Sequence, residues 1–540
     1  MKNVEIYPVS SMTKIFSDAH PSPETHGSML KNETYSFQVA VETGDTALCG
    51  ATLRFGGDLA ERISFYPVRA LPCDLPDYDG HDSYVEIRAD GMYPELCEET
   101  VLFDVRPHET VGVWVTVSGA PKAGRHEIPV ALVSDDTPVA ETSYMLTVTD
   151  AQLPAEKKYI THWMHYDCIA ELHGVPVFSD DFYHVFDAYL RAYIELGNTM
   201  LLVPTLTPAL DTAVGAERMT AQLVKITVED GRYLFDFSDL DRFIDFVAER
   251  GIRYFEFAHL FTQWGAEFCP KVMATVDGKE TKIFGWDDKS DGDAYRAFLS
   301  AYLPALCEYL HTKGIAENSF FHMSDEPTDE HLERYIGHYN FVKPLIGDIR
   351  TIDALSHYAF AEKHVVDMPV SVTTSAAEFR DHDVAHMSYT CCQPYIGNYS
   401  NRFFCMTGER TRVIGFQIYL NGSRGFLHWG YNFYHTKLSV SVLNPYTDTT
   451  AGGAFPGGDS FLVYPDTRRG GVQKSIRYHM MHDAFQDLRA LELLESRIGR
   501  DAVVRLLHDF GLFDYNEYPH SARVLHDLRN EINRLIGETA

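Results

Sequence analysis

Residues 1–153 alternate between apolar and polar positions with a period of two. The segments "ETYSFQVAVET" (33–43), "TVGVWVTVSG" (110–119) and "HEIPVALVS" (126–134) show this alternation, and clusters of Gly, Pro, Asp and Asn separate them. A period of two places the apolar side chains on one face of a strand, while Gly and Pro mark the turns between strands. We therefore predict an N-terminal antiparallel β-sandwich domain over residues 1–153.

The pattern changes after about residue 155, where short apolar segments alternate with amphipathic helical ones. "FYHVFDAYLRAYIELG" (182–197) precedes "NTMLLVPT", and "YRAFLSAYLPALCEYLHTKG" (295–314) precedes "SFFHMSDEP". Both helical segments end in Gly, which is typical of a helix C-terminus. About 300 residues of this alternation favour a (β/α)8 TIM-type barrel over a doubly wound sheet, because no glycine-rich phosphate-binding fingerprint follows the first strand. We place the catalytic barrel at residues 154–510 and expect residues 511–540 to form a helical tail packed on it.

Several predicted strands of the barrel end in polar and aromatic residues. The strand ends read "THWMHYDC" (161–168), "FAHLFTQWGAEF" (257–268), "FHMSDEP" (321–327), "SYTCCQPY" (388–395) and "GFLHWGYNFY" (425–434). Enzymes with this fold build their active sites at the carboxyl ends of the strands. Helix surfaces favour Lys and Glu, so Trp, His, Gln and Asn at these positions indicate a binding or catalytic site.

Asp325 and Glu326 stand side by side after the apolar segment 320–323 and before Pro327. Two nearby carboxylates raise the pKa of one of them, and glycoside hydrolysis needs a protonated acid for the departing oxygen. Two adjacent side chains can reach one substrate only if the backbone turns between them, and Pro327 is consistent with such a turn. The alternative is a helix N-terminus, which favours acids in its first turn. We assign Asp329 and Glu330 to such a helix start, whereas position alone leaves both readings open for the pair.

The charge of the chain excludes several classes of partner. It carries 46 Lys and Arg against 77 Asp and Glu, a formal net charge of −31. This charge repels nucleic acids and anionic membranes, and a neutral substrate suits it better. The N-terminus has no apolar leader, and no run of about 18 apolar residues occurs. We expect a cytoplasmic protein, or a secreted one whose signal peptide has been removed.

The nine cysteines are scattered except for the adjacent Cys391 and Cys392, and no C-x-x-C spacing occurs. This usage predicts neither a disulfide framework nor a zinc site. His162 and His165 invite a metal interpretation, but their spacing in a strand places them on opposite faces. We therefore expect no metal and no cofactor.

The strand-end motifs together resemble glycoside hydrolase family 123, the β-N-acetylgalactosaminidases. The resemblance covers the barrel from about residue 155 to about residue 500 and is carried by "TPALDT", "LFTQWGA", "FHMSDEP", "SNRF", "GFLHWGYNFY" and "SFLVYP". It implies an exo-acting retaining hydrolase of terminal β-linked N-acetylgalactosamine (GalNAc) that uses the substrate's own acetamide oxygen as nucleophile. It further implies that Asp325 orients and stabilises the 2-acetamido group, and that Glu326 is the general acid and then the base.

Seven further residues are candidate contacts to the sugar: Trp429, Asn432, Tyr389, Gln263, Trp264, Arg402 and Asp459. Trp429 is the candidate apolar platform under the ring, and Tyr389 a hydroxyl donor to the acetamide oxygen. A place in the core is the alternative for both aromatic residues and for Trp264. Arg402 and Asp459 would bind sugar hydroxyls or else form structural or solvated salt bridges. Asp211 in "TPALDT" would contact the substrate or hold its own loop.

Two other functions remain open from the sequence. A β-N-acetylhexosaminidase with another 2-acetamido specificity fits equally, because epimers differ at a single hydroxyl. A non-catalytic carbohydrate-binding protein would keep the barrel but lose the Asp–Glu pair, which is present here. The expected partner is a carbohydrate or glycoconjugate with terminal β-GalNAc, with no nucleic acid and no membrane, and the oligomeric state is open.

Overall fold

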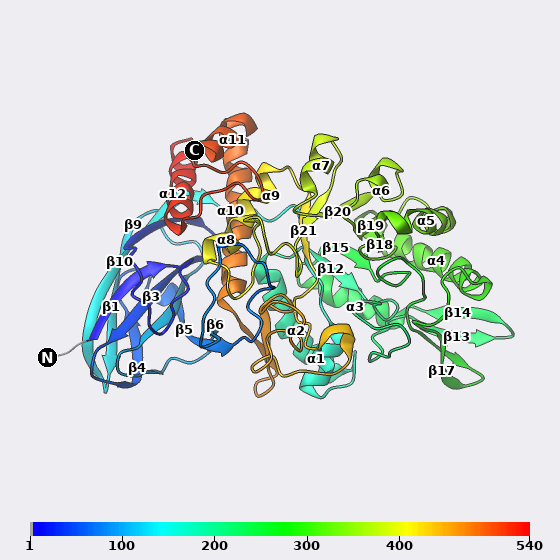
Figure 1. The fold of residues 1–540 in the computed structure, drawn as a ribbon, viewed down its shortest axis with the longest axis horizontal. Coiled ribbons are helices and arrows are strands. Elements are labelled where there is room, and N and C mark those ends of the chain that lie inside the picture. The colour runs from blue at the N-terminus through cyan, green and yellow to red at the C-terminus, as the bar shows by residue number, and fades with distance from the viewer. Residues whose placement is uncertain (1–3, 540) are drawn as a thin grey trace.

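The computed structural model describes residues 4–539, and its N-terminal part is the predicted β-sandwich (Figure 1). Its two five-stranded sheets have the orders β1-β3-β8-β5-β6 and β2-β10-β9-β4-β7. The strands are β1 (Val4–Ser10), β2 (His26–Lys31), β3 (Tyr35–Thr43), β4 (Leu48–Phe55), β5 (Ile63–Pro72), β6 (Met92–Cys97), β7 (Phe103–Val105), β8 (Thr110–Val117), β9 (Gly124–Ser134) and β10 (Thr137–Gln152). All pairs are antiparallel except β2 with β10, which is parallel.

The period-two pattern of the sequence explains the core of the sandwich. Phe37, Val39 and Val41 on β3 are fully buried and face the second sheet, from which Tyr144 stacks on Phe37 with ring centroids 4.3 Å apart. Stacked aromatic pairs of this kind add to the burial of apolar area, which is the main stabilising contribution in a sandwich.

Eight parallel strands follow and form a nearly closed barrel. Their order is β11-β22-β21-β20-β19-β18-β15-β12, and β12 returns to β11 through a backbone hydrogen bond of 2.9 Å from Thr199 to Ile160. The strands are β11 (Tyr159–His162), β12 (Met200–Val203), β15 (Tyr254–Phe257), β18 (Ser319–His322), β19 (Arg350–Ala354), β20 (Met368–Val372), β21 (Met387–Tyr389) and β22 (Gly425–His428). The predicted parallel barrel is therefore present.

The helical layer is thinner than a regular (β/α)8 barrel predicts, since α6 and α7 have only four and six residues. The helices of the barrel are α1 (Tyr166–His173), α2 (Asp180–Leu196), α3 (Ser238–Glu249), α4 (Asp293–Lys313), α5 (Leu332–Ile346), α6 (Ala359–Glu362), α7 (Ala376–Asp381), α8 (Gly408–Arg412), α9 (Ile414–Leu420) and α10 (Ile476–Ile498). The predicted glycine C-caps Gly197 and Gly314 have φ values of 112° and 77°, a region that favours glycine.

Two excursions leave the barrel strands. The segments after β12 and β15 form a small sheet of β13 (Lys225–Glu229), β14 (Arg232–Asp236), β16 (Val272–Val276) and β17 (Lys279–Phe284). The segment after β22 carries the hairpin of β23 (Val463–Asp466) and β24 (Gly471–Lys474). Among residues 4–539, no helix is both long and apolar enough to cross a bilayer.

Helix α10 lies between the barrel and the sandwich and is buried along most of its length (Figure 1). Its Arg477 forms an ion pair of 2.6 Å with Glu95 of β6, and both side chains are almost fully buried. Gln486 exchanges two hydrogen bonds of 2.8 Å with the backbone of Thr34, which precedes β3. The segment that includes Phe485 and Gln486 therefore joins the two halves of the molecule.

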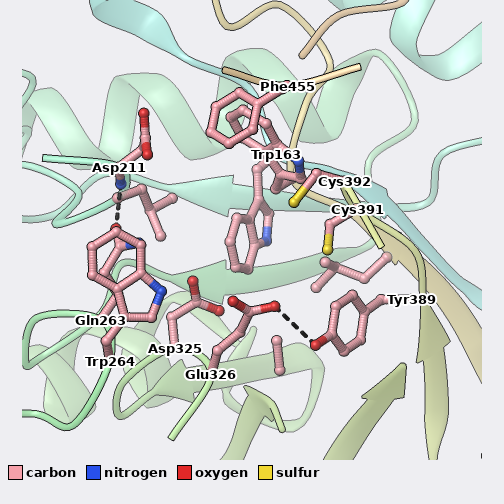
Figure 2. A pocket seen from close by; sticks show the side chains of 14 residues that line it. Trp163, Asp211, Gln263, Trp264, Asp325, Glu326, Tyr389, Cys391, Cys392 and Phe455 are labelled. Atoms are coloured by element: carbon pink, nitrogen blue, oxygen red, sulfur yellow. Dashed lines mark hydrogen bonds between the residues drawn. The ribbon is translucent and has the colours of Figure 1, made fainter. Parts of the chain in front are cut away.

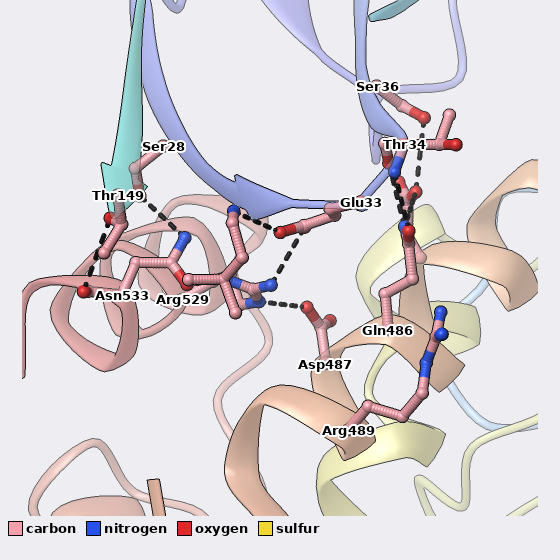
Figure 3. A network of polar contacts seen from close by, with 12 residues as sticks. Ser28, Glu33, Thr34, Ser36, Thr149, Gln486, Asp487, Arg489, Arg529 and Asn533 are labelled. Atoms are coloured by element: carbon pink, nitrogen blue, oxygen red, sulfur yellow. Dashed lines mark hydrogen bonds and ion pairs between the residues drawn. The ribbon is translucent and has the colours of Figure 1, made fainter. Parts of the chain in front are cut away.

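Helix α11 (Arg500–Asp509) ends just before the predicted tail of residues 511–540, and α12 (Ala522–Glu538) lies within it. We expected this tail to pack on the barrel, but α12 contacts the sandwich strands β2 and β10 as well as α10. Figure 3 shows Arg529 of α12 between Glu33, from the turn after β2, and Asp487 of α10, with both ion pairs at 2.9 Å. The domain boundaries drawn from the sequence remain predictions.

Candidate active site

A pocket of about 620 Å³, partly open to solvent, lies at the carboxyl ends of the barrel strands (Figure 2). Six of the predicted site residues line it: Asp325, Glu326, Gln263, Trp264, Tyr389 and Trp429. They come from four different strand ends, which the closure of the barrel brings together.

The backbone turns sharply at the acidic pair. Strand β18 ends at His322, and Glu326 has a φ of 46°, in the left-handed region that is unusual for a residue with a side chain. The Glu326 N–H donates to the carbonyl of Ala354 at 2.9 Å, and the Asp325 carbonyl accepts from the N–H of Trp264 at 2.8 Å. These bonds hold the turn, and Figure 2 shows both carboxylates pointing into the pocket.

The two carboxylates have different surroundings. Asp325 is 8% exposed, and burial, followed by repulsion from Glu326, raises the pKa of Asp325 well above its usual value. Glu326 is half-buried, and its Oε1 accepts a hydrogen bond of 2.9 Å from the hydroxyl of Tyr389. Burial and repulsion within the pair therefore favour the protonated form of Asp325.

Past Pro327 the chain starts a helix, as the sequence suggests for Asp329 and Glu330. Thr328 caps the short 3₁₀ turn of residues 329–331, which leads into α5. Asp329 is exposed and pairs with His357 at 3.1 Å. These two acids therefore occupy the first turn of a helix and take no part in the pocket.

Trp429 is half-buried in the pocket wall and its orientation is held from behind. Its indole Nε1 donates to Oδ2 of Asp459 at 3.1 Å, and the ring of Phe455 packs on it at 5.3 Å. Asp459 is fully buried, and this burial raises its pKa to about 7. Asp459 thus lies behind the wall and contacts Trp429, where the sequence had suggested a sugar hydroxyl as its partner.

Arg402 and Asn432 are also absent from the pocket surface. Arg402 is 1% exposed and donates to the Nδ1 of His428 and to the carbonyl of Asp459, at 2.8 and 2.9 Å. Asn432 is fully buried and bonds both the N–H and the carbonyl of His165. The hydrogen-bond partners of these two predicted sugar ligands are therefore backbone and side-chain groups of the protein itself.

Asp211 and Gln263 meet at the pocket rim. The Asp211 N–H donates to the side-chain oxygen of Gln263, while its carboxylate accepts from the N–H of Leu438 at 2.8 Å. Asp211 therefore holds its loop and also lines the pocket. Trp264 is 48% exposed at the same rim, which excludes the core alternative for this residue.

The sequence did not identify several residues that line the pocket, namely Trp163, Leu210, Ala354, Leu427, Phe455 and the cysteine pair, Cys391 and Cys392. Trp163 follows β11 directly, so its strand-end position was the available signal. Phe455 lies in a long loop with no regular pattern. Both members of the cysteine pair are partly exposed, in contrast to the six cysteines that are buried.

A buried polar network lies beneath the pocket. His322 contacts Glu256 at 2.9 Å and Asp353 at 3.3 Å, and none of the three is exposed. His259 stacks on His322 with ring centroids 4.3 Å apart and an angle of 22° between the rings.

Within residues 4–539, His259, His322 and Asp353 form the one group of side chains that lie close enough together to hold a metal ion. A metal lies in the ring plane of each histidine ligand, and two stacked rings do not share such a point. The nitrogens of His322 also already face carboxylates. His162 and His165 instead bond the side chain of Asn198 and the carbonyl of Trp429. These donors do not fit a resident metal.

Comparison with known proteins points to one family. The family described as glycoside hydrolase 123, catalytic domain, matches residues 163–494, more than half of the chain. A family 123 glycoside hydrolase from Clostridium perfringens, studied for glycolipid glycan hydrolysis, aligns with 99% of this chain and 97% of its own at a TM-score of 0.73 and 13% identity. A family 39 glycoside hydrolase from Bacteroides cellulosilyticus aligns with 82% of this chain and 81% of its own at a TM-score of only 0.34 and 9% identity. No curated protein matches the sequence.

Proposed function

The chain belongs to glycoside hydrolase family 123, and we propose from this premise that it is an exo-acting retaining β-N-acetylgalactosaminidase. The observation that carries the proposal is the turn at Glu326. Consecutive residues of an extended strand point to opposite faces, whereas the left-handed φ at Glu326 brings Asp325 and Glu326 into one pocket. The substrate would be a glycan or glycoconjugate with a terminal β-linked GalNAc.

The first chemical step forms a ring on the substrate itself. The oxygen of the 2-acetamido group attacks the anomeric carbon while the carboxylic acid of Glu326 donates its proton to the departing glycosidic oxygen. The product is a cyclic oxazolinium ion, and the leaving group departs as a neutral alcohol. No carboxylate of the protein forms a bond to the sugar.

Asp325 would accept the acetamide N–H and balance the positive charge that develops on the oxazolinium nitrogen. This role requires an ionised Asp325 and a protonated Glu326 at the same time. The pKa of Asp325 is raised in the free enzyme. In the complex, the substrate N–H and the developing charge would favour the ionised form of Asp325 and so the transfer of its proton to Glu326. Burial also strengthens the attraction between the carboxylate and the charge.

In the second step, water attacks the anomeric carbon, the bond from that carbon to the acetamide oxygen breaks, and Glu326, now a carboxylate, removes a proton from the water. The two inversions at the anomeric carbon give net retention. Tyr389 contacts Glu326 in the free enzyme, and we propose that its hydroxyl donates to the acetamide oxygen once Glu326 is protonated. Trp429 and Trp264 would contact the apolar faces of the substrate, one in the wall and the other at the rim.

A panel of aryl glycosides tests the proposal. Aryl β-GalNAc should be hydrolysed with retained anomeric configuration, as followed by proton NMR, and a thiazoline mimic of the oxazoline should inhibit competitively. The matching glucosaminide separates this enzyme from a hexosaminidase of another specificity. Failure to cleave any aryl 2-acetamido glycoside would contradict the assignment as an enzyme of this class.

Two variants assign the roles within the pair. Glu326→Gln should lower kcat roughly 10²–10⁴-fold on substrates with poor leaving groups and far less on dinitrophenyl glycosides, which need no protonation. Asp325→Asn should slow the first step with every leaving group. Asp329→Asn, an exposed acid four positions further on, serves as the control and should be fully active. Normal turnover in both pair variants would place the site elsewhere.

A further inference from the structure

The network beneath the pocket joins three neighbouring barrel strands. Glu256 comes from β15, His322 from β18 and Asp353 from β19, and none of the three side chains has exposed surface. Glu256 also accepts hydrogen bonds from Thr161 and from the indole of Trp163, the latter at 3.2 Å. An unpaired polar group at this depth is costly, and each of these three side chains has hydrogen-bond partners.

The partners of His322 determine its charge. Burial alone would lower the pKa of His322, but hydrogen bonds and attraction from Asp353 and Glu256 outweigh it and raise the pKa to about 9. The stacked His259 has a pKa held well below its usual value by burial and by His322, so it stays neutral. The contacts of His322 with the carboxyl groups of Glu256 and Asp353, at 2.9 and 3.3 Å, therefore favour its imidazolium form.

This network contacts the acidic pair through the backbone. Oδ1 of Asp353 accepts the N–H groups of Met323 and Ser324 at 2.9 and 3.2 Å, the two residues directly before Asp325. Tyr335 donates to the other oxygen of Asp353. The turn that presents the pair is thus held by the same carboxylate that holds His322.

The charged groups that act on the pKa of Asp325 are Glu326, His322 and Asp353. Glu326 and Asp353 both disfavour a negative charge on Asp325, as does burial, and His322 favours it. Burial and the two acidic neighbours favour the protonated form of Asp325, which neither accepts the acetamide N–H nor balances an oxazolinium charge, and His322 opposes them.

We propose that His322 is a positioning cation for this reaction, held between Glu256 and Asp353 so that Asp325 ionises inside the pocket. The inference rests on the proposed role of Asp325 and adds a residue that does not touch the substrate. It acts through Asp325 and through the turn that Asp353 holds.

The pH profile of kcat/KM tests the inference in three variants. His322→Gln removes the cation, so the pKa of Asp325 rises and the ascending limb should move up by roughly one pH unit. The double variant His322→Gln, Asp353→Asn also removes an acidic neighbour and relieves the unpaired buried carboxylate, so its limb should lie between those of the single variant and the wild type. His479→Gln, a buried neutral histidine that stacks on Trp114, is the matched control and should leave the limb in place.

A second measurement does not depend on turnover. In nitrogen-detected histidine spectra of the whole protein at pH 7.5, the signal lost in His322→Gln should have the shifts of an imidazolium, and the signal lost in His479→Gln those of a neutral ring. A neutral His322, or an ascending limb unmoved in both His322 variants of an active enzyme, overturns the inference. A wild type without activity on any 2-acetamido glycoside contradicts the proposed function instead, and the spectra still decide the charge of His322.

Discussion

Replacement of Arg529 by Met tests whether the C-terminal helix joins the sandwich and the barrel energetically. The Arg529 side chain is 5% exposed and pairs with Glu33 and Asp487, which are 4% and 0% exposed (Figure 3). Met fills a similar volume but leaves two buried carboxylates with fewer partners. Removal of one member of a buried ion pair costs about 3–5 kcal/mol.

The shift in Tm equals the lost free energy of unfolding divided by the unfolding entropy, which depends on how many residues unfold together. If all 540 residues unfold together, the unfolding entropy is about 1.1 kcal/mol/K and Tm should fall by about 3–4 °C. If the sandwich, which ends with β10 at Gln152, unfolds alone, its entropy is about 0.3 kcal/mol/K and its transition should fall by about 10–15 °C. Scanning calorimetry distinguishes these outcomes by the number of transitions and by which one moves.

Two further variants complete the experiment. Arg529→Met with Glu33→Gln removes one of the unpaired charges and keeps an acceptor for the Leu30 N–H, so most of the lost stability should return. Arg534→Met, which removes an exposed arginine of the same helix, should leave every transition unchanged. Activity per folded molecule should match the wild type in all three. A loss below about 1 kcal/mol in Arg529→Met would refute the reasoning, because the pair would then behave like an exposed one.

Three further predictions concern the pocket. Asp459→Leu should raise KM up to roughly tenfold because Trp429 loses a hydrogen bond, which contributes about 0.5–1.5 kcal/mol. Asp459→Asn, which keeps an acceptor, should leave KM near the wild-type value, and equal KM values in both variants would contradict this. Tyr389→Phe removes the hydroxyl that donates to Glu326 and should lower kcat roughly tenfold. Circular dichroism should show an intact fold, and an unchanged kcat would exclude a role for the hydroxyl. One equivalent of a trivalent aryl arsenical should inactivate the enzyme by bridging Cys391 and Cys392 in the pocket wall, and a dithiol should restore the activity. Replacement of either cysteine by serine should prevent the inactivation, whereas replacement of the exposed Cys49 should leave the enzyme sensitive.

The local pattern of the chain was enough to predict its architecture. Period-two alternation reports which face of a strand is buried, and a strand followed by a glycine-capped helix reports a parallel sheet, so the sandwich and the barrel could be recognised. The same alternation located the strand ends, and therefore Asp325, Glu326, Tyr389, Gln263 and Trp429 at one rim. The lengths of α6 and α7, the parallel pairing of β2 with β10 and the contacts of α12 with the sandwich did not follow from that pattern.

Tertiary structure decided which of the candidate polar residues reach the pocket and what charge each of them carries. Arg402, Asn432 and Asp459 resemble sugar ligands by residue type, yet they are buried behind the wall. Their partners His165, His428 and Trp429 lie at or just after the ends of β11 and β22. Burial and the distance between side chains far apart in sequence determine a pKa, and neither is a local property. The sequence by itself determined that two carboxylates stand at the end of a barrel strand. Only the folded chain placed Glu326 in a left-handed turn and surrounded Asp325 with His322 and Asp353, because these contacts arise when separate strands close into a barrel.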